Sequence, residues 1–303
     1  MEKGHKEKIS IACECMDFVE ASHKNRVYPL MYCNMKLLGH LNTNRLKYAV
    51  SVSSRIIPEI LCAFDFEHGL FIDQGFSAEN VIRADGVEPF QWNISKAPQL
   101  QIAIRQEGKT SFVTVGMSHV LADGMGFLQY LYLLAALYNG TLPNTQIQNQ
   151  RKITPLLNGI RVGRQTEQTT RNKHIPLRPL RSDSRGKQLF CVCSRISADE
   201  LPAIQATARK YHATLNEAFM VAYARVIGRW HNTDRVLLPC PADLRRFQPM
   251  AQQLTVANMT GIYRKLVVEV GPDRTFTQAL GQLHIVVNAQ PGCCRSFSDI
   301  ALL

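Results

Sequence analysis

Residues 110–138 read TSFVTVGMSHVLADGMGFLQYLYLLAALY. The first part is rich in β-branched and aromatic residues, as a buried strand is, and the last part is apolar nearly all round, as a core helix is. Between them lie His119 and Asp123, with Gly124 directly after. Polar groups against two buried elements cost free energy unless they are paired. The spacing indicates an oriented base, although a single histidine beside a core is more often structural than catalytic.

Strand and helix patterns alternate on both sides of this stretch. Before it we expect an initial strand within residues 1–24, a strand over 28–38 and short strands on either side of His68-Gly69. We also expect a helix over 42–57, capped by Asn42 or Thr43 and ended by Pro58. A hairpin of 100–105 with 110–117 leads into the stretch itself. After it we expect strands over 188–196, 236–244 and 261–270, and helices over 215–230 and 276–289. Three capping-box patterns, Ser197 with Glu200, Thr214 with Glu217 and Thr275 with Gln278, support the helix starts.

The composition is that of a folded protein large enough for two cores. The chain has 303 residues, 46% of them hydrophobic, so two lobes are expected. No apolar run is long enough to span a membrane, and no hydrophobic segment follows the N-terminal charges as in an export signal. The nine cysteines are odd in number and too scattered for a zinc site, so we expect reduced thiols, no bound metal and a cytoplasmic location.

Most of the net charge of +11 lies in one segment. Between Thr141 and Lys187, ten basic residues stand against two acidic ones, a net charge of +8, among prolines and polar residues without clear periodicity. One interpretation is a solvated linker. The other is an electrostatic collar for an anionic donor such as coenzyme A or an acidic carrier protein. No aromatic-interleaved basic stripe accompanies it, so nucleic-acid binding is not expected.

The pattern H-x-x-x-D-G, after a strand and before an apolar helix, resembles the signature of the chloramphenicol-acetyltransferase-like superfamily. This superfamily includes condensation domains, polyketide-associated and alcohol acyltransferases, and acyl-CoA-dependent acyltransferases. The resemblance implies an α/β protein of two such lobes with mixed sheets covered by helices: an N-terminal lobe over 1–145, a basic linker over 146–187 and a C-terminal lobe over 188–303. The chain stops where further elements of that lobe are expected, so we expect the second lobe to be shortened.

The resemblance also implies roles for individual residues. His119 would be the general base, Asp123 a structural carboxylate paired with an arginine of the second lobe, and Arg245 that arginine, although Arg245 could equally be a surface residue. Gly124 fits a close backbone approach or a positive φ, and its amide could help to bind an oxyanion. Ser118 and Asn258 would line the tunnel between the lobes. A Ser118 nucleophile is disfavoured, because neighbouring strand residues point to opposite sides.

The sequence thus predicts an acyltransferase of secondary metabolism. It would move an acyl group from a coenzyme A or carrier-protein thioester to an alcohol or amine, without a metal or organic cofactor. Condensation domains usually carry a second histidine where this chain has Ser118, which favours ester-type transfer. A condensation-type, amide-forming enzyme working between carrier proteins and a noncatalytic binding protein with a shortened second lobe remain as alternatives.

Overall fold

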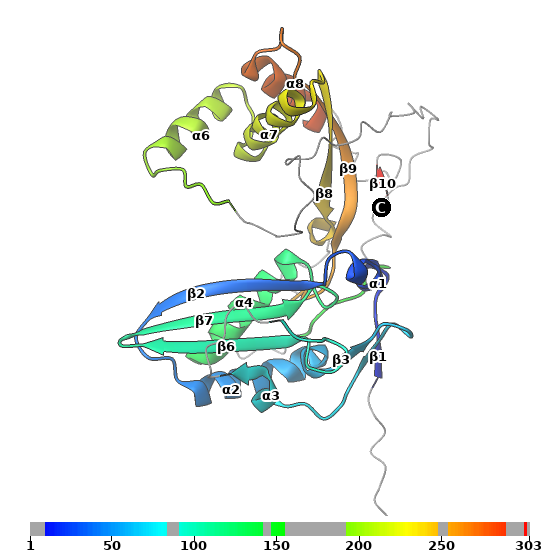
Figure 1. Cartoon of the computed structure of the whole chain (residues 1–303), viewed down its shortest axis with the longest axis vertical. Coiled ribbons are helices and arrows are strands. Elements are labelled where there is room, and N and C mark those ends of the chain that lie inside the picture. The colour runs from blue at the N-terminus through cyan, green and yellow to red at the C-terminus, as the bar shows by residue number, and fades with distance from the viewer. Residues whose placement is uncertain are drawn as a thin grey trace, which may run out of the picture. The chain divides into compact units, whose positions relative to one another are not determined.

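The computed structural model describes residues 10–83, 91–141, 147–154, 192–247, 254–288 and 300–301. The chain divides into two compact units, Met1–Asn158 with Asp243–Gly261 and Gly159–Ala242 with Ile262–Leu303. Both units combine sheets with helices (Figure 1), so the predicted α/β class is confirmed.

A four-stranded sheet in the order β2-β7-β6-β5 is the centre of the first unit. Its strands are β2 (Leu30–Leu38), β5 (Ile82–Arg83), β6 (Leu100–Glu107) and β7 (Thr110–Ser118). β7 lies between β2 and β6 (Figure 1) and pairs antiparallel with both, which confirms the predicted hairpin. Val113, Val115 and Met117 of β7 enter the core together, because alternate side chains of a strand share one face.

Two helices share one hydrophobic core with this sheet. They are α2 (Thr43–Ile56) and α4 (Gly124–Asn139), which pack against each other. α2 begins at its predicted cap, where the Asn42 side chain accepts a hydrogen bond of 3.0 Å from the Arg45 N–H, and it ends just before Pro58. Its buried residues recur at helical spacing and form one face: Leu46, Ala49, Val50 and Ser53.

A second, smaller sheet of the first unit has the order β1-β4-β3. Its strands are β1 (Ser10–Ala12), β3 (Ala63–Asp65) and β4 (Leu70–Ile72). The predicted initial strand is only three residues long, and a helix that the sequence analysis missed, α1 (Cys15–Ser22), follows it. The remaining short elements of this unit are η1 (His23–Asn25), η2 (Pro58–Leu61), α3 (Ala78–Val81) and η3 (Leu244–Phe247).

The second unit packs helices against a sheet in the order β10-β9-β8. Its described elements are β8 (Arg235–Asp243), β9 (Thr260–Glu269), β10 (Ile300–Ala301), α6 (Glu200–Lys210), α7 (Leu215–His231) and α8 (Phe276–Asn288). The last residue of β8 and the first two of β9 belong to the first unit. The hydrogen bonds of all three predicted capping boxes are present. Of the predicted strand over 188–196, residues 192–196 have no regular structure, and the rest lie outside the described residues.

The boundaries of the units differ from the lobes expected from the sequence. Residues 243–261 were assigned to the C-terminal lobe, but they pack into the first unit, because their buried polar groups find partners there. Of the expected basic linker, residues 147–154 also belong to the first unit, and residues 155–187 lie outside the described part of the chain. Each unit therefore consists of two separate stretches of the chain.

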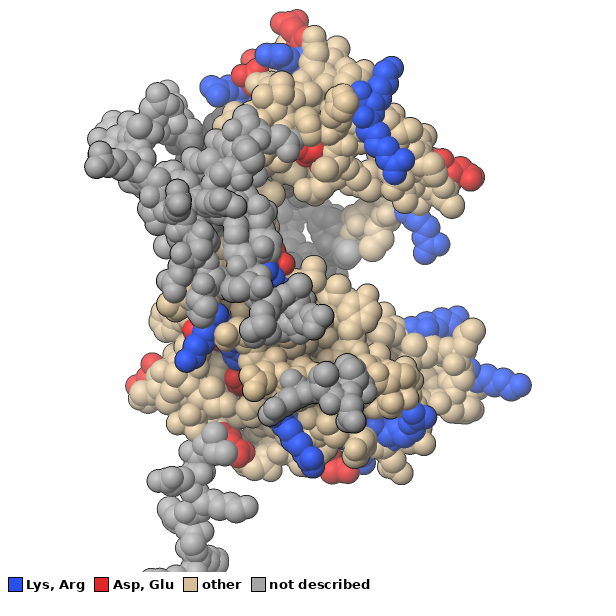
Figure 2. All heavy atoms as spheres, turned by 180° about the vertical axis from the view of Figure 1, so that it is seen from behind, with Lys and Arg blue, Asp and Glu red and all other residues tan. Residues whose placement is uncertain are grey.

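Over the described residues, basic side chains are dispersed. On the face drawn in Figure 2, Lys and Arg stand singly or in small groups among other residues and form no continuous stripe. None of the described helices has the length and apolar character needed to cross a lipid bilayer.

Candidate active site

His119 lies in the tight turn that joins β7 to α4. Its backbone N–H donates to the Pro29 carbonyl oxygen at 2.8 Å, and its own carbonyl oxygen accepts from Asn258 Nδ2 at 2.9 Å. Both partners come from other parts of the chain, so the main chain of His119 is fixed on two sides. The imidazole is about one-third exposed (32%), which leaves it accessible while its Nδ1 atom is buried.

A pocket of about 220 Å³ opens beside this imidazole. It is lined by His119, by Glu20 of α1, by His23 and by residues 26–30. All of these residues belong to the first unit, so the pocket does not depend on where the second unit lies. A partly exposed imidazole at the wall of a pocket is the arrangement that a general base requires.

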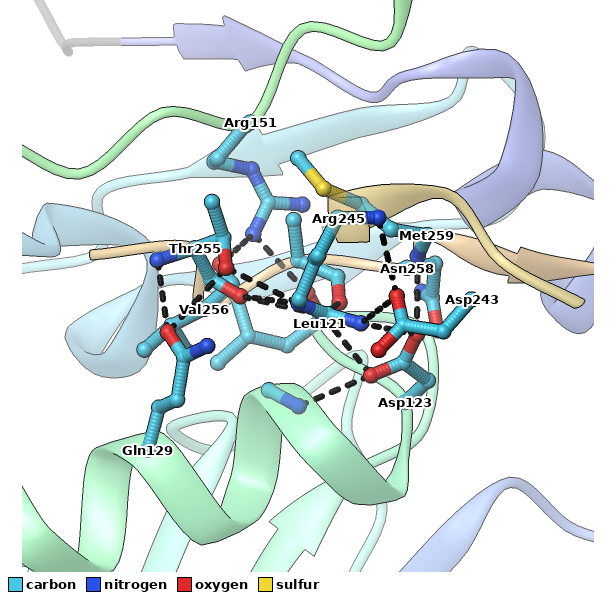
Figure 3. A network of polar contacts seen from close by, with 12 residues as sticks. Leu121, Asp123, Gln129, Arg151, Asp243, Arg245, Thr255, Val256, Asn258 and Met259 are labelled. Carbon is cyan, nitrogen blue, oxygen red and sulfur yellow. Dashed lines mark hydrogen bonds and ion pairs between the residues drawn. The ribbon is translucent and has the colours of Figure 1, made fainter. Parts of the chain in front are cut away.

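Asp123 caps the N-terminus of α4 and is almost fully buried. Its Oδ1 accepts from the Gly126 N–H at 2.8 Å and its Oδ2 accepts from the Met259 N–H at 2.8 Å. Arg245 contacts both carboxylate oxygens, at 2.8 Å from Nη2 to Oδ1 and 3.0 Å from Nη1 to Oδ2 (Figure 3). The expected ion pair is therefore present. Both partners lie in the first unit, whereas the resemblance had implied an arginine of the second lobe.

The surroundings of Asp123 favour its ionised form. Burial by itself raises the pKa of a carboxyl group, because it removes water from the charged form. Here the hydrogen bonds and positive charge of Arg245, together with the N–H groups of Gly126 and Met259, outweigh burial, and the pKa of Asp123 lies below its ordinary value. Asp123 is thus a fixed anion that orients Arg245 and the start of α4.

Residues 254–259 form an irregular, largely buried segment beside the motif. Its backbone groups need partners, since an unpaired buried carbonyl or N–H is costly. Arg245 donates to the carbonyls of Thr255 (3.0 Å) and Ala257 (2.8 Å), and Arg151 donates to that of Val256 (3.0 Å). Figure 3 shows Arg245 beside Thr255 and Arg151 beside Val256. Two arginine side chains, 94 positions apart in the chain, therefore hold this segment against the loop after β7.

Ser118 and Asn258 do not line the pocket beside His119. Asn258 is 3% exposed, and its Nδ2 contacts the carbonyl oxygens of His119 and Val120 and the carboxylate of Asp17, at 2.9 to 3.0 Å. Ser118 is fully buried, and its Oγ accepts from the Val120 N–H at 3.2 Å. Both side chains are instead used to shape the turn, and that they line a tunnel between the lobes stays a prediction. The burial of Ser118 agrees with the expectation that this side chain is not a nucleophile.

The close backbone approach expected at Gly124 occurs two residues later. A Cβ atom at Gly124 would meet nothing within 4 Å, and the φ of Gly124 is not positive. At Gly126 a Cβ would lie 2.8 Å from the Ala257 carbonyl oxygen, closer than real Cβ contacts. Gly126 therefore lets α4 touch the buried segment, and Gly124 leaves open space at the exposed first turn of the helix.

Sequence reasoning missed a buried charge cluster next to the site. Arg151, counted in the basic linker, is 9% exposed; its Nη2 lies 2.6 Å from Asp17 Oδ2 and its Nε 3.3 Å from Glu59 Oε1. Burial raises the pKa of Asp17, although Arg151 and Asn258 oppose this shift. Asp17 and Ala21, four positions apart, are buried on one face of α1, but eight residues are too few for this spacing to stand out in the sequence.

No protein-family model matches this sequence, and no curated protein matches it. Solved structures do resemble it. Polyketide synthase associated protein 5 from Mycobacterium tuberculosis aligns with a TM-score of 0.68 at 17% identity, over 94% of this chain and 75% of that chain. The condensation domain from Monacolin K polyketide synthase MokA aligns at 0.62 and 14% identity, over 96% and 75% of the two chains. The first condensation domain of the calcium-dependent antibiotic synthetase aligns at 0.66 and 12% identity, over 95% and 76%.

The protein therefore has the condensation-domain fold, of the chloramphenicol-acetyltransferase-like type that the motif predicted. It spans about three quarters of each of these three chains, and 34% of the chain of the nonribosomal peptide synthetase FmoA3. Identities of 12 to 17% establish the fold alone.

Proposed function

We propose that this protein is an acyltransferase that moves an acyl group from a thioester, of coenzyme A or a carrier protein, to an alcohol or amine. The observation that carries the proposal is the position of His119. Its imidazole stands in a pocket at the end of β7, in a turn that Asn258 and the Asp123–Arg245 pair hold in place. The fold, shared with condensation domains, adds support.

On this proposal His119 is the general base. The imidazole takes the proton from the acceptor hydroxyl or amine as the oxygen or nitrogen attacks the thioester carbonyl carbon. A C–O or C–N bond forms, the C–S bond breaks, and the proton passes to the departing thiolate. Histidine suits this work because its unperturbed pKa lies near neutrality, and such a base contributes about 10²- to 10⁴-fold in rate. A thioester is already activated, so the step requires a base and positioning.

A thiol-release assay tests the proposal. The protein is mixed with acyl-coenzyme A or acyl-carrier-protein donors of graded chain length and a panel of alcohols and amines, and the released free thiol is measured. We expect acceptor-dependent release that His119→Ala lowers by at least about 10²-fold. The exposed His40, replaced by alanine, is a matched control and should leave release unchanged.

Two results would contradict the proposal. Near-normal turnover in a folded His119→Ala variant would remove the imidazole from the mechanism. The absence of thiol release with every donor would favour a noncatalytic binding protein.

Condensation-type amide formation between carrier proteins is the second candidate, and the likeness to condensation domains favours it. It predicts that amine acceptors tethered to a carrier protein react faster than free alcohols. Ester-type transfer predicts the reverse. The same assay, run with tethered and free acceptors, separates the two.

A further inference from the structure

Helix α1 places a carboxylate beside the imidazole of the motif. Glu20 lies in the last turn of α1, and its Oε2 is 3.7 Å from His119 Nδ1. The Glu20 side chain is 25% exposed, and both residues line the same pocket. This carboxylate comes from a helix that the sequence analysis missed, nearly one hundred residues before the motif.

His119 Nδ1 is buried, and no hydrogen-bond partner for it occurs among the described residues. A buried nitrogen in that state costs free energy, and hydrogen bonds of a catalytic base are often long in a ligand-free structure and shorten when substrate binds. A hydrogen bond from nitrogen to oxygen needs about 2.7–3.2 Å, so a small movement of the Glu20 side chain would close the gap. Glu20 faces the correct ring nitrogen to be this partner.

The consequence for the imidazole is chemical. A neutral imidazole carries one N–H and one lone pair, and an ionised carboxylate only accepts hydrogen bonds. A carboxylate facing Nδ1 therefore favours the tautomer with hydrogen on Nδ1, which leaves the lone pair on Nε2. A negative charge at this position also stabilises the imidazolium that forms when Nε2 takes a proton.

We propose that Glu20 is a positioning residue for His119, which holds the Nδ1–H tautomer and makes Nε2 the base. This inference rests on the proposed function for its role in turnover, but the tautomer itself can be measured without activity. The other titratable or charged side chains around the pocket are His23, Arg26 and Tyr28. Among the described residues that line the pocket, Glu20 carries the carboxylate, and this carboxylate faces His119 Nδ1.

The position of Glu20 is itself secured from inside the molecule. Asp17, one helical turn earlier, is fully buried and pairs with Arg151. Asn258 joins Asp17 Oδ1 to the His119 carbonyl oxygen, at 2.9 Å on each side. The same amide thus ties helix α1 to the turn that carries the imidazole, so Glu20 and His119 are held in register.

Nitrogen-15 NMR of the imidazoles tests the proposal directly. Spectra of the whole chain are recorded at about pH 8.5, where an unperturbed histidine is neutral, and the His119 signals are assigned by their loss in His119→Gln. We expect the Nδ1–H tautomer in the wild type and a shift toward the Nε2–H tautomer in Glu20→Ala. Glu67→Ala, an exposed glutamate of the same unit, should leave the tautomer unchanged.

Kinetics provide the second readout. In Glu20→Ala we expect kcat for thiol release to fall by about 10- to 10²-fold with the KM for the acceptor nearly unchanged, since the base is misoriented and the pocket is kept. An unchanged tautomer in Glu20→Ala overturns the role of Glu20, whether or not the protein is active. A changed tautomer together with no thiol release from the wild type supports the positioning and overturns the acyltransferase proposal instead.

Discussion

Arg245 and Asp123, 122 positions apart in the chain, form a buried ion pair in which each carboxylate oxygen faces its own guanidinium nitrogen. Their side chains are 8% and 5% exposed. Arg245 also donates to Thr255 Oγ1 and to the carbonyl of Ala257. The pair thus joins the start of α4 to the buried segment, and this is a role in architecture, since neither side chain lines the pocket.

Replacing either partner of this ion pair alone should destabilise the folded protein. Removing one partner leaves a buried charge, so Asp123→Asn and Arg245→Ala should each lower the free energy of unfolding by about 3–5 kcal/mol. The double variant should lose much less than the sum, because the stranded charge is then gone. Denaturant unfolding measures all three. The more exposed pair of Arg274 with Glu269 is the control, and Arg274→Ala should cost about 1 kcal/mol or less. Strictly additive losses would contradict the pairing.

The carboxylate of Asp123 should also make the free energy of unfolding depend on pH. The folded-state pKa of Asp123 lies below its ordinary value of 3.8, so its contribution is fully present above about pH 4 and is lost as pH falls through the folded-state pKa. The pKa of Asp17 is shifted in the opposite direction, so variants must be compared one site at a time. The unfolding free energy of the wild type should therefore fall more steeply below pH 4 than that of Asp123→Asn. Parallel curves for the two proteins would argue against an ionised, paired Asp123.

Elements defined by local pattern could be predicted from the sequence. Helix α2, with its Asn42 cap and Pro58 stop, and the hairpin of β6 and β7 depend on neighbours in the chain, and both were predicted with small errors at their ends. Helix α1 was missed, because its eight residues are too few for a clear period and were taken for part of a strand.

Contacts between distant residues could be predicted only where the resemblance supplied them. The motif supplied His119 and Asp123, and the resemblance supplied the pairing with Arg245. Nothing in the local sequence distinguishes Arg151, which is buried, from Lys152, which is exposed. Likewise Asn149 acquires its role only when the segment 254–259 folds against it, and Asn258, within that segment, only when the segment reaches the turn after β7.

Asn258 and Asn149 form a matched pair for separating positioning from stability. Both side chains hydrogen-bond buried backbone, but Asn149 contacts Val256 whereas Asn258 contacts the carbonyl of His119. Alanine at either position should lower the unfolding free energy by about 1–3 kcal/mol. Only Asn258→Ala should also lower kcat per folded molecule, by about 10-fold or more, because the imidazole is then less well placed. Equal effects of both variants on kcat would show that Asn258 acts through stability alone.

Arg151 and Lys152, adjacent in the chain, differ sharply in environment. Arg151 is paired with Asp17 and Glu59 and lies over the ring of Phe71, 5.4 Å from its centroid, whereas Lys152 is exposed. Arg151→Ala leaves two buried carboxylates without their cation and should cost about 3–5 kcal/mol, measured by denaturant unfolding. Lys152→Ala should change the unfolding free energy by about 0.5 kcal/mol or less, as surface substitutions do. If both residues belonged to a solvated linker, the two variants would unfold alike, and that result would disprove the buried cluster.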